Sequence, residues 1–266
     1  MEPKNMERSF ETDLENMSIH DWTSQTDDPV NDEVRNNIID YLNQIRVPIP
    51  SNNYDLYLKL EVTDKDVLDI GICAHTMERM RSPNWIHNII RNNAKSAMGI
   101  DIIKDLIQQL QKDGLDVAVC DATSDEDLGR QFDVVHVGDV LEHVDNPVAL
   151  MKFCGRHLRP GGKIIARTPN AHCFGYIHLQ RKYGTEKSNL EHMFYICPIH
   201  AMELARRSGI RLTRYLTLYP GKLSVKGIKR FLYYALLFKF RHALAEFLTK
   251  PETYSTIFVF EFKKPT

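Results

Sequence analysis

The segment VLDIGIC, residues 67–73, decides the fold that this sequence predicts. Its apolar residues suit a buried parallel strand. Asp69 and Gly71 suit the carboxyl end of such a strand, where a ligand crevice opens and glycine lets the backbone approach the ligand. A second strand ends in MGID, so that Asp101 stands where a carboxylate can bind two ribose hydroxyls. Together the two strands predict a nucleoside-cofactor site in an α/β fold.

The turn after the first strand departs from the glycine pattern of dinucleotide-binding proteins. In G-x-G-x-x-G, the second and third glycines let backbone amides and a helix N-terminus close on phosphate. Here Cys73 and Thr76 hold those positions, and the next predicted helix, near residues 85–94, starts well downstream. The turn therefore argues against a pyrophosphate ligand. S-adenosylmethionine carries no phosphate and tolerates such a loop, whereas an unrelated ligand at the same crevice is the alternative.

The segments that follow continue the alternation of strands and helices. A helix is predicted over residues 148–158, and it ends at RPGG, residues 159–162, because proline and glycine cannot continue it. Further strands are predicted over residues 115–120, 132–137, 163–168, 212–218 and 255–262. These elements predict a doubly wound, mostly parallel sheet of seven strands.

In this order and spacing, the chain resembles class I S-adenosylmethionine-dependent methyltransferases, in the branch of ubiquinone-pathway, sugar and natural-product O-methyltransferases. The resemblance covers roughly residues 54–218. Its carriers are VLDIG, the turn at Asp101, FDVVHVGDVLEHVDNP, LRPGGKIIARTPN and the stretch from His192 to Gly209, which looks like the helix before the sixth strand. It implies a Rossmann-like methyltransferase with S-adenosylmethionine as its cofactor. The cofactor-binding residues that it implies are Asp69, Gly71, Cys73, Asp101, Asp121, Ala122 and Gly138. For Asp69 the alternative is that it orders the turn beneath the cofactor.

Composition narrows the class of protein. A chain of 266 residues holds one sizeable core plus appendages, and a formal net charge of −1 gives no global attraction to nucleic acid. The five cysteines form no C-x-x-C pair, which disfavours a zinc site or a disulfide framework and favours the reducing cytosol. No signal peptide and no bilayer-spanning apolar run are recognisable. We therefore expect a cytoplasmic protein.

Four units are expected: a helical cap and linker at 1–53, a methyltransferase core at 54–220, a helical insertion at 221–251, and a last strand at 252–266. In the cap, Trp22 and Tyr41 are candidates for substrate contact, and packing on the sheet edge is the alternative. Pro48 and Pro50 mark its linker.

The insertion at 221–251 alternates basic and aromatic residues. This pattern is typical of an amphipathic helix that lies on the inner face of a membrane or over a hydrophobic or phosphorylated substrate. The alternative is the buried face of a packed helix.

Histidines supply the candidate catalytic residues. Methyl transfer to a hydroxyl requires alignment, exclusion of water and removal of a proton, and histidine is the natural base near neutral pH. His143 follows the fourth strand, and His172 and His192 follow the fifth. For His143 the alternative role is to organise the cleft.

A candidate metal site consists of Asp139, Glu142, His143 and His192. One helical turn places both carboxylates on one side, next to the two imidazoles, and such a set suits magnesium, manganese or iron better than a structural zinc. The arrangement resembles the E-x-x-E-H plus distant His pattern of small-RNA 2′-O-methyltransferases, with Asp139 in place of the first Glu. An acidic turn with ordinary hydrogen bonds is the alternative.

Cations gather after the fifth strand, on the expected acceptor side. Arg167, Asn170 and Arg181 are the candidate substrate-binding residues, and they suit an anionic group such as the phosphate of a nucleotide-linked sugar. The leading hypothesis is O-methylation of a small-molecule acceptor: a saccharide, a phosphorylated metabolite or a natural product. A metal-assisted RNA 2′-O-methyltransferase, which the charge balance disfavours, and a non-catalytic cofactor- or partner-binding module are the alternatives. The acceptor and the oligomeric state stay open.

Overall fold

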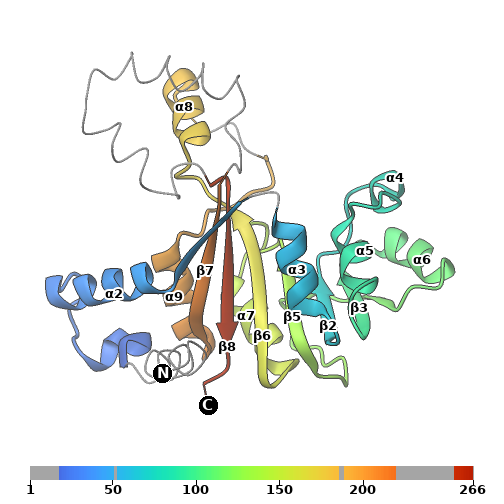
Figure 1. The fold of residues 1–266 in the computed structure, drawn as a ribbon, viewed down its shortest axis with the longest axis horizontal. Helices are drawn as coiled ribbons and strands as arrows, with labels where there is room; N and C mark the ends of the chain where they lie inside the picture. The colour runs from blue at the N-terminus through green and yellow to red at the C-terminus, as the bar shows by residue number, and fades with distance from the viewer. Residues whose placement is uncertain (1–17, 51–52, 186–188, 220–254, 266) are drawn as a thin grey trace, which may run out of the picture.

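A computed structural model describes residues 18–50, 53–185, 189–219 and 255–265. The predicted insertion at 221–251 and residues 1–17 lie outside these ranges. One sheet with helices on both sides forms the body of the molecule (Figure 1). None of the helices in the described ranges combines the length and the apolar character needed to cross a membrane.

Within the described residues the sheet has eight strands, in the order β1-β7-β8-β6-β5-β2-β3-β4. The strands are β1 (Arg46–Pro50), β2 (Asp66–Ile70), β3 (Ser96–Asp101), β4 (Val117–Val119), β5 (Phe132–Gly138), β6 (Leu158–Pro169), β7 (Arg211–Tyr219) and β8 (Ile257–Lys263). Of these eight, only β8 runs antiparallel to its neighbours, β6 and β7. The seven predicted strands are all present, and the predicted mostly parallel α/β sheet is confirmed.

The additional strand, β1, lies in the segment that we predicted to be a linker because it contains Pro48 and Pro50. It lies at the edge of the sheet and pairs in parallel with β7, with Pro48 opposite Thr217. Proline is tolerated in an edge strand because its nitrogen, which has no hydrogen to donate, can face the side without a partner. The sheet therefore begins at Arg46, ahead of the predicted core boundary at residue 54.

Helices cover both faces of the sheet. They are η1 (Ser18–Ser24, a 3₁₀ helix), α2 (Asp32–Gln44), α3 (Tyr54–Val62), α4 (Met77–Met80), α5 (Ile86–Arg91), α6 (Lys104–Lys112), α7 (Pro147–Arg156), α8 (Phe174–Tyr183) and α9 (Pro198–Ser208). Val134 of β5 packs with Leu58 of α3 and Ile90 of α5, whereas the next residue, Val135, packs in the cluster that includes Phe153 of α7. Successive residues of a strand point to opposite faces, so β2 and β5 are apolar on both sides.

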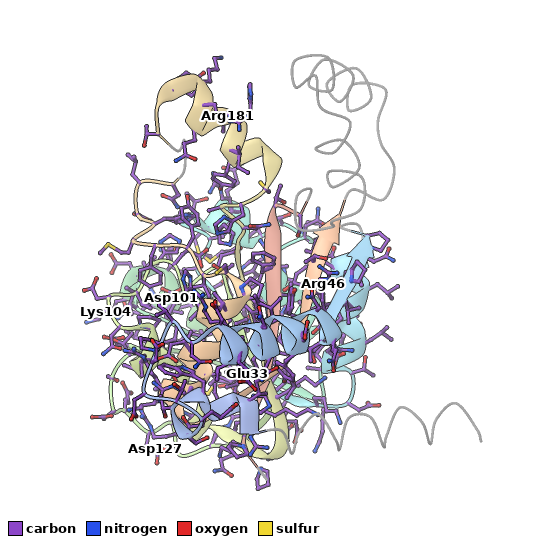
Figure 2. All side chains as sticks on the ribbon, turned by 90° about the vertical axis from the view of Figure 1, so that its left-hand side faces the viewer. Glu33, Arg46, Asp101, Lys104, Asp127 and Arg181 are labelled. Atoms are coloured by element: carbon purple, nitrogen blue, oxygen red, sulfur yellow. The ribbon has the colours of Figure 1, made fainter. Side chains whose placement is uncertain are left out.

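The N-terminal helices pack at the side of the sheet that holds α9 and β7 (Figures 1 and 2). Trp22 Nε1 donates to Glu203 Oε2 of α9 at 2.9 Å, and the Tyr41 hydroxyl donates to the Leu212 carbonyl at 2.6 Å. Neither Trp22 nor Tyr41 lines the cavities described below. These contacts agree with the alternative for the two residues, packing beside the sheet, and their predicted contact with substrate stays a prediction.

The carboxyl ends of β2 and β5 lie side by side where the strand order reverses. Asp69 of β2 is opposite Gly99 of β3 on one side and His136 of β5 on the other. In open parallel sheets, ligands bind in the crevice at such a reversal point. The fold therefore brings the turn after β2 and the turn after β5 to one site.

Candidate active site

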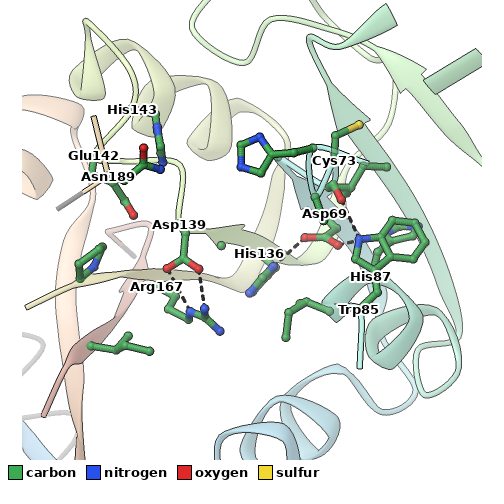
Figure 3. Close-up of a pocket in the computed structure, with 18 of the residues that line it drawn as sticks. Asp69, Cys73, Trp85, His87, His136, Asp139, Glu142, His143, Arg167 and Asn189 are labelled. Carbon is green, nitrogen blue, oxygen red and sulfur yellow. Dashed lines mark hydrogen bonds and ion pairs between the residues drawn. The ribbon is translucent and has the colours of Figure 1, made fainter. Parts of the chain in front are cut away.

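Two cavities adjoin at the carboxyl ends of the central strands. The first, of about 430 Å³, is lined by the ends of β2, β3 and β4. The second, of about 640 Å³, is lined by the ends of β2, β5 and β6 and is shown in Figure 3. Both cavities are lined by Gly71, Cys73, His75, Asp139 and His143. These five residues, which we call the junction, line the place where the two cavities adjoin.

Asp101 is fixed at the wall of the first cavity. Its Oδ2 accepts from the Cys73 amide at 2.8 Å, and its Oδ1 accepts from the Ile103 amide at 3.0 Å. A carboxylate oxygen has two lone pairs, so each oxygen can accept one more hydrogen bond. This geometry supports the predicted contact of Asp101 with two ribose hydroxyls.

Gly71 is required by its surroundings. Its φ is +77°, in the left-handed region that favours glycine. A Cβ placed on it would lie 2.2 Å from Cγ2 of Val140, far inside van der Waals contact. The close approach of the two turns at the junction therefore depends on the absence of a side chain here.

The remaining predicted cofactor residues divide between the cavities. Asp121 and Ala122 line the first cavity, where Oδ1 of Asp121 accepts from the amide and the hydroxyl of Thr123. Gly138 lines the second cavity and not the first. Burial, reinforced by Asp101, raises the pKa of the Cys73 thiol to about 12, so this thiol stays neutral.

Asp69 lies at the centre of a buried network beneath the second cavity. Its two oxygens face Nδ1 of His87 at 2.9 Å and Nδ1 of His136 at 2.7 Å (Figure 3). Nε2 of His136 lies 3.2 Å from the Tyr54 hydroxyl. A carboxylate only accepts, so both imidazoles donate from Nδ1. Burial alone would raise the pKa of Asp69, but the imidazoles of His136 and His87 lower it to about 2. Asp69 is fully engaged within the protein, which favours the alternative that it orders the turn.

Asp139 is directed to Arg167 of β6 and not to the predicted metal ligands. Two hydrogen bonds join the side chains, from Nη2 to Oδ2 at 2.5 Å and from Nε to Oδ1 at 3.1 Å (Figure 3). The φ of Asp139 is +54°, so the backbone turns sharply here as the chain leaves β5. The guanidinium of Arg167 also lies over the ring of Tyr54. Asp139 thus neutralises Arg167 in the wall of the second cavity.

The other three predicted metal ligands do come together. One ligand atom from each of Glu142, His143 and His192 lies within 4.8 Å of the others, and the two imidazole rings are 4.7 Å apart. Glu142 is fully buried, and its Oε2 accepts from the Thr168 hydroxyl at 3.0 Å. Glu142 Oε1 and His192 Nδ1 are buried and have no hydrogen-bond partner within the described ranges. Burial raises the pKa of Glu142 to about 7, whereas burial and His143 lower the pKa of His192.

Three predicted site residues lie elsewhere. Asn170 is fully buried and donates to the Ser255 carbonyl at 2.7 Å, while its Oδ1 accepts from the His172 amide, so it joins β6 to the start of β8. Arg181 is exposed on α8, apart from Asp101 (Figure 2). Asn170, His172 and Arg181 line neither cavity. The same stretch of chain between β6 and α9 instead brings Tyr176, Asn189 and His192 to the second cavity.

Sequence reasoning missed several residues of the second cavity. These are His75 and Arg79 of the first turn, Trp85 and His87, His136, and Tyr176 of α8. Only a histidine inside the apolar strand β5 was a visible signal, because a buried polar side chain in a central strand needs a partner. The other contacts join residues that are far apart in the sequence.

Comparison with known proteins places this site in a family. Residues 46–212 match the family model described as "Methyltransferase domain". A "Ubiquinone biosynthesis O-methyltransferase" of Pseudomonas fluorescens (strain SBW25) is 28% identical over 130 residues, which is 45% of this chain and 52% of that protein. Its counterpart in Nitrosococcus oceani is 31% identical over 104 residues, or 37% and 44% of the two chains. The chain spans about half the length of these curated relatives.

Solved structures agree on the fold. A SAM dependent methyltransferase from Archaeoglobus fulgidus superposes with a TM-score of 0.54 at 15% identity, over 80% of this chain and 92% of that one. A S-adenosylmethionine-dependent methyltransferase from Clostridium acetobutylicum ATCC 824 gives 0.50 at 11% identity, over 82% and 93%. At these identities the likeness shows the fold alone. Since the family match contains Gly71, Asp101 and the turn after β5 on the matching fold, the chain belongs to the class I S-adenosylmethionine-dependent methyltransferases.

Proposed function

We propose that this protein transfers the methyl group of S-adenosylmethionine to a hydroxyl oxygen of a small-molecule acceptor. The observation that carries the proposal is the junction, where Gly71, Cys73, His75, Asp139 and His143 line both cavities. Asp101 and Gly71 would hold S-adenosylmethionine in the first cavity, where it would supply the methyl group. The second cavity then holds the acceptor. Distant relatives named as O-methyltransferases support transfer to oxygen.

His143 is the proposed general base. It lines both cavities, and its imidazole lies beside that of His192. The bound cofactor would supply the methyl group, its carbon–sulfur bond breaking with the bonding pair going to sulfur as the acceptor oxygen bonds to carbon, and His143 would take the hydroxyl proton. The products are the methyl ether, S-adenosylhomocysteine and a proton that His143 later releases. Positioning and base catalysis are the two contributions that the protein makes.

The second cavity favours an acceptor rich in hydroxyl groups. Histidines and carboxylates contribute to its wall, and Arg167, one of the two arginines that line it, is already neutralised by Asp139. An anionic acceptor would therefore gain little from Arg167, whereas hydroxyls can both donate to carboxylates and accept from imidazoles. Saccharides and catechol-like natural products fit this description better than apolar compounds.

The test is product analysis with purified protein, S-adenosylmethionine and a panel of saccharides, nucleotide-linked sugars and dihydroxybenzoates. Formation of S-adenosylhomocysteine together with an O-methyl product, identified by mass spectrometry and NMR, is the expected result. His143→Ala should lower kcat at least about 100-fold, because general base catalysis contributes about that much or more, while cofactor affinity is retained. His200→Ala, at an exposed position of α9, is the matched control and should leave kcat unchanged. Methyl transfer to nitrogen, or full turnover by His143→Ala, would contradict the proposal.

Metal-assisted transfer is a second candidate mechanism. It is favoured by two buried atoms next to His143, Glu142 Oε1 and His192 Nδ1, which have no hydrogen-bond partner among the described residues. One carboxylate and two imidazoles suit magnesium, manganese or iron with positions left open for substrate oxygens. Bound there by Glu142, His143 and His192, a divalent ion would lower the pKa of an acceptor hydroxyl. The same ligands would suit a ribose diol at an RNA end, for which binding should weaken steeply with salt.

Manganese binding tests this mechanism directly. We expect the chelator-treated protein to take up one Mn²⁺, followed by calorimetry and by the electron paramagnetic resonance signal, and we expect Glu142→Gln to abolish uptake. Glu33→Gln on α2, at an exposed position (Figure 2), is the control and should bind as the unaltered protein does. No uptake by the unaltered protein would remove the metal and leave His143 as an ordinary base.

A further inference from the structure

Two cationic or hydrogen-bonding side chains of the turn after β2 have no role in the proposed chemistry. His75 lines both cavities, and Arg79 of α4 lines the second. In the described part of the chain, neither side chain has a hydrogen-bond or ion-pair partner. Both are exposed and accessible from the cavity.

The backbone at His75 is held in an unfavourable conformation. The Thr76 amide donates to the Ala74 carbonyl at 2.8 Å, which closes a three-residue turn around His75, and the φ of His75 is +63°. Such γ-turns with positive φ are rare and strained, and a residue without a side chain would adopt this conformation more easily. Strain of this kind persists where surrounding bonds hold it and is often found at functional sites.

Neighbouring hydrogen bonds fix the turn in this position. The Cys73 amide donates to Asp101, and Nε1 of Trp85 donates to the Ile72 carbonyl at 2.7 Å. The side chain of His75 is therefore presented at the junction by a turn that is tied both to the ribose-binding carboxylate and to the hydrophobic cluster around Trp85.

The charges of the second cavity leave Arg79 available for an anion. Arg167 is paired with Asp139, and Asp69 is shared between two imidazoles. Arg79 is thus the arginine of this wall, within the described residues, that has no acidic partner. A guanidinium binds a carboxylate through two parallel hydrogen bonds, and an imidazole N–H beside it adds a third donor.

The direction of the cofactor indicates which anion reaches these residues. Asp101 and Ala122 line the first cavity, and His75 lies at its junction with the second. S-adenosylmethionine held by its ribose at Asp101 would reach the junction with its amino-acid end, which carries a carboxylate. We propose that His75 and Arg79 form a carboxylate-binding site that holds the amino-acid end of the cofactor. The site replaces the close backbone approach that a glycine-rich turn would offer. This proposal depends on S-adenosylmethionine being the cofactor, as in the proposed function, and not on which acceptor is methylated.

Calorimetric titration with two ligands tests the site. S-adenosylhomocysteine carries the amino acid, whereas 5′-methylthioadenosine has the same nucleoside and sulfur without it. Arg79→Gln and His75→Gly should each weaken S-adenosylhomocysteine binding about tenfold or more and leave 5′-methylthioadenosine binding within about twofold, since a lost charged hydrogen bond costs about a factor of ten in affinity. Arg81→Gln, next to α4 and outside both cavities, is the matched control and should bind both ligands normally.

Folding is checked in the same variants. His75→Gly relieves a positive φ, so its melting temperature should not fall, and a loss of affinity cannot then be assigned to unfolding. Equal weakening of both ligands would show that the turn, and not a carboxylate contact, has been disturbed, and would overturn the proposal.

The anion could also belong to the acceptor, and the same variants separate the two sources. In these variants, the affinity for S-adenosylhomocysteine could stay unchanged while inorganic phosphate becomes a weaker competitive inhibitor against the acceptor. That result would overturn the cofactor assignment and give the anion site to the acceptor. No change in either measurement would overturn the site altogether. If the variants change neither measurement but the protein still O-methylates its acceptor at saturating cofactor, the anion site is wrong and the proposed function stands.

Discussion

At the scale of single residues, the two turns of the site impose opposite demands on side-chain size. Gly71 has no room for a Cβ because Val140 of the second turn fills the space above it. His75 and Asp139 carry side chains at positive φ, where glycine is the easier residue. The backbone conformation at these three positions therefore follows the packing and side chains of the site and not the usual preference of each residue type.

Gly71→Ala should weaken both folding and cofactor binding. The added methyl group would overlap Cγ2 of Val140 and adopt an unfavourable φ, and overpacking of this kind costs about 1–3 kcal/mol. Urea denaturation measures the loss. The double variant Gly71→Ala with Val140→Ala should recover part of it, because it removes the overlapping atom but not the φ penalty. Additive effects of the two changes would contradict the steric explanation.

Asp69 predicts a pH dependence of stability. Its pKa is about 2 in the folded protein against 3.8 for an unperturbed aspartate, so its contribution is present above about pH 4 and is lost as the pH falls toward 2. The shift corresponds to about 2 kcal/mol at neutral pH, because one pKa unit is about 1.36 kcal/mol.

Asp69→Asn should lower the free energy of unfolding by about that amount at pH 7, with the deficit shrinking between pH 4 and pH 2. Urea denaturation at a series of pH values, with Asp40→Asn on the exposed face of α2 as the control, provides the comparison. A deficit that is the same at every pH would show that the carboxylate charge is not what stabilises the network.

At the scale of elements, local signals placed the helix before β6 to within two residues but not the start of β6 itself. The predicted helix at 148–158 is α7, which begins at Pro147 behind an Asn146 cap and ends at Arg156. β6 already begins at Leu158 and contains the RPGG segment, so the strand predicted at 163–168 starts five residues earlier than expected. β1 was missed because proline lowers any local strand signal, and only its place at the sheet edge makes two prolines acceptable.

Asn146→Ala should destabilise the protein by about 1 kcal/mol through α7. The Asn146 side chain accepts from the Ala149 amide at 3.0 Å, and loss of such a cap has about this effect. Thermal or urea unfolding measures it. Asn146→Asp keeps an acceptor at the same place and should retain most of the stability, whereas an equal loss in both variants would argue against capping.

At the scale of the whole molecule, the sequence predicted the class of fold, seven of the eight strands and the carboxyl-end crevice. Glu142, His143 and His192 were also predicted as a group and do lie together. These predictions were possible because strands and helix ends have local sequence signals, and because a parallel sheet brings the carboxyl ends of its strands to one edge. Asn170, His172 and Arg181 line neither cavity, and their catalytic or substrate-binding roles stay predictions; Asn170 is held by the Ser255 carbonyl, 85 positions away, a contact that no local signal indicates. The link between Tyr54 and His136 likewise required the packing of α3 on the sheet.

The position of β8 has a consequence for biosynthesis. β8 lies between β6 and β7, although it is the last of the eight strands along the chain. Until residues 257–263 have left the ribosome, β6 and β7 each have an open apolar edge, and such edges invite pairing with other chains. The growing polypeptide therefore cannot close its sheet stepwise. Final closure must wait for a single late strand, so protection of the nascent chain matters most in that interval.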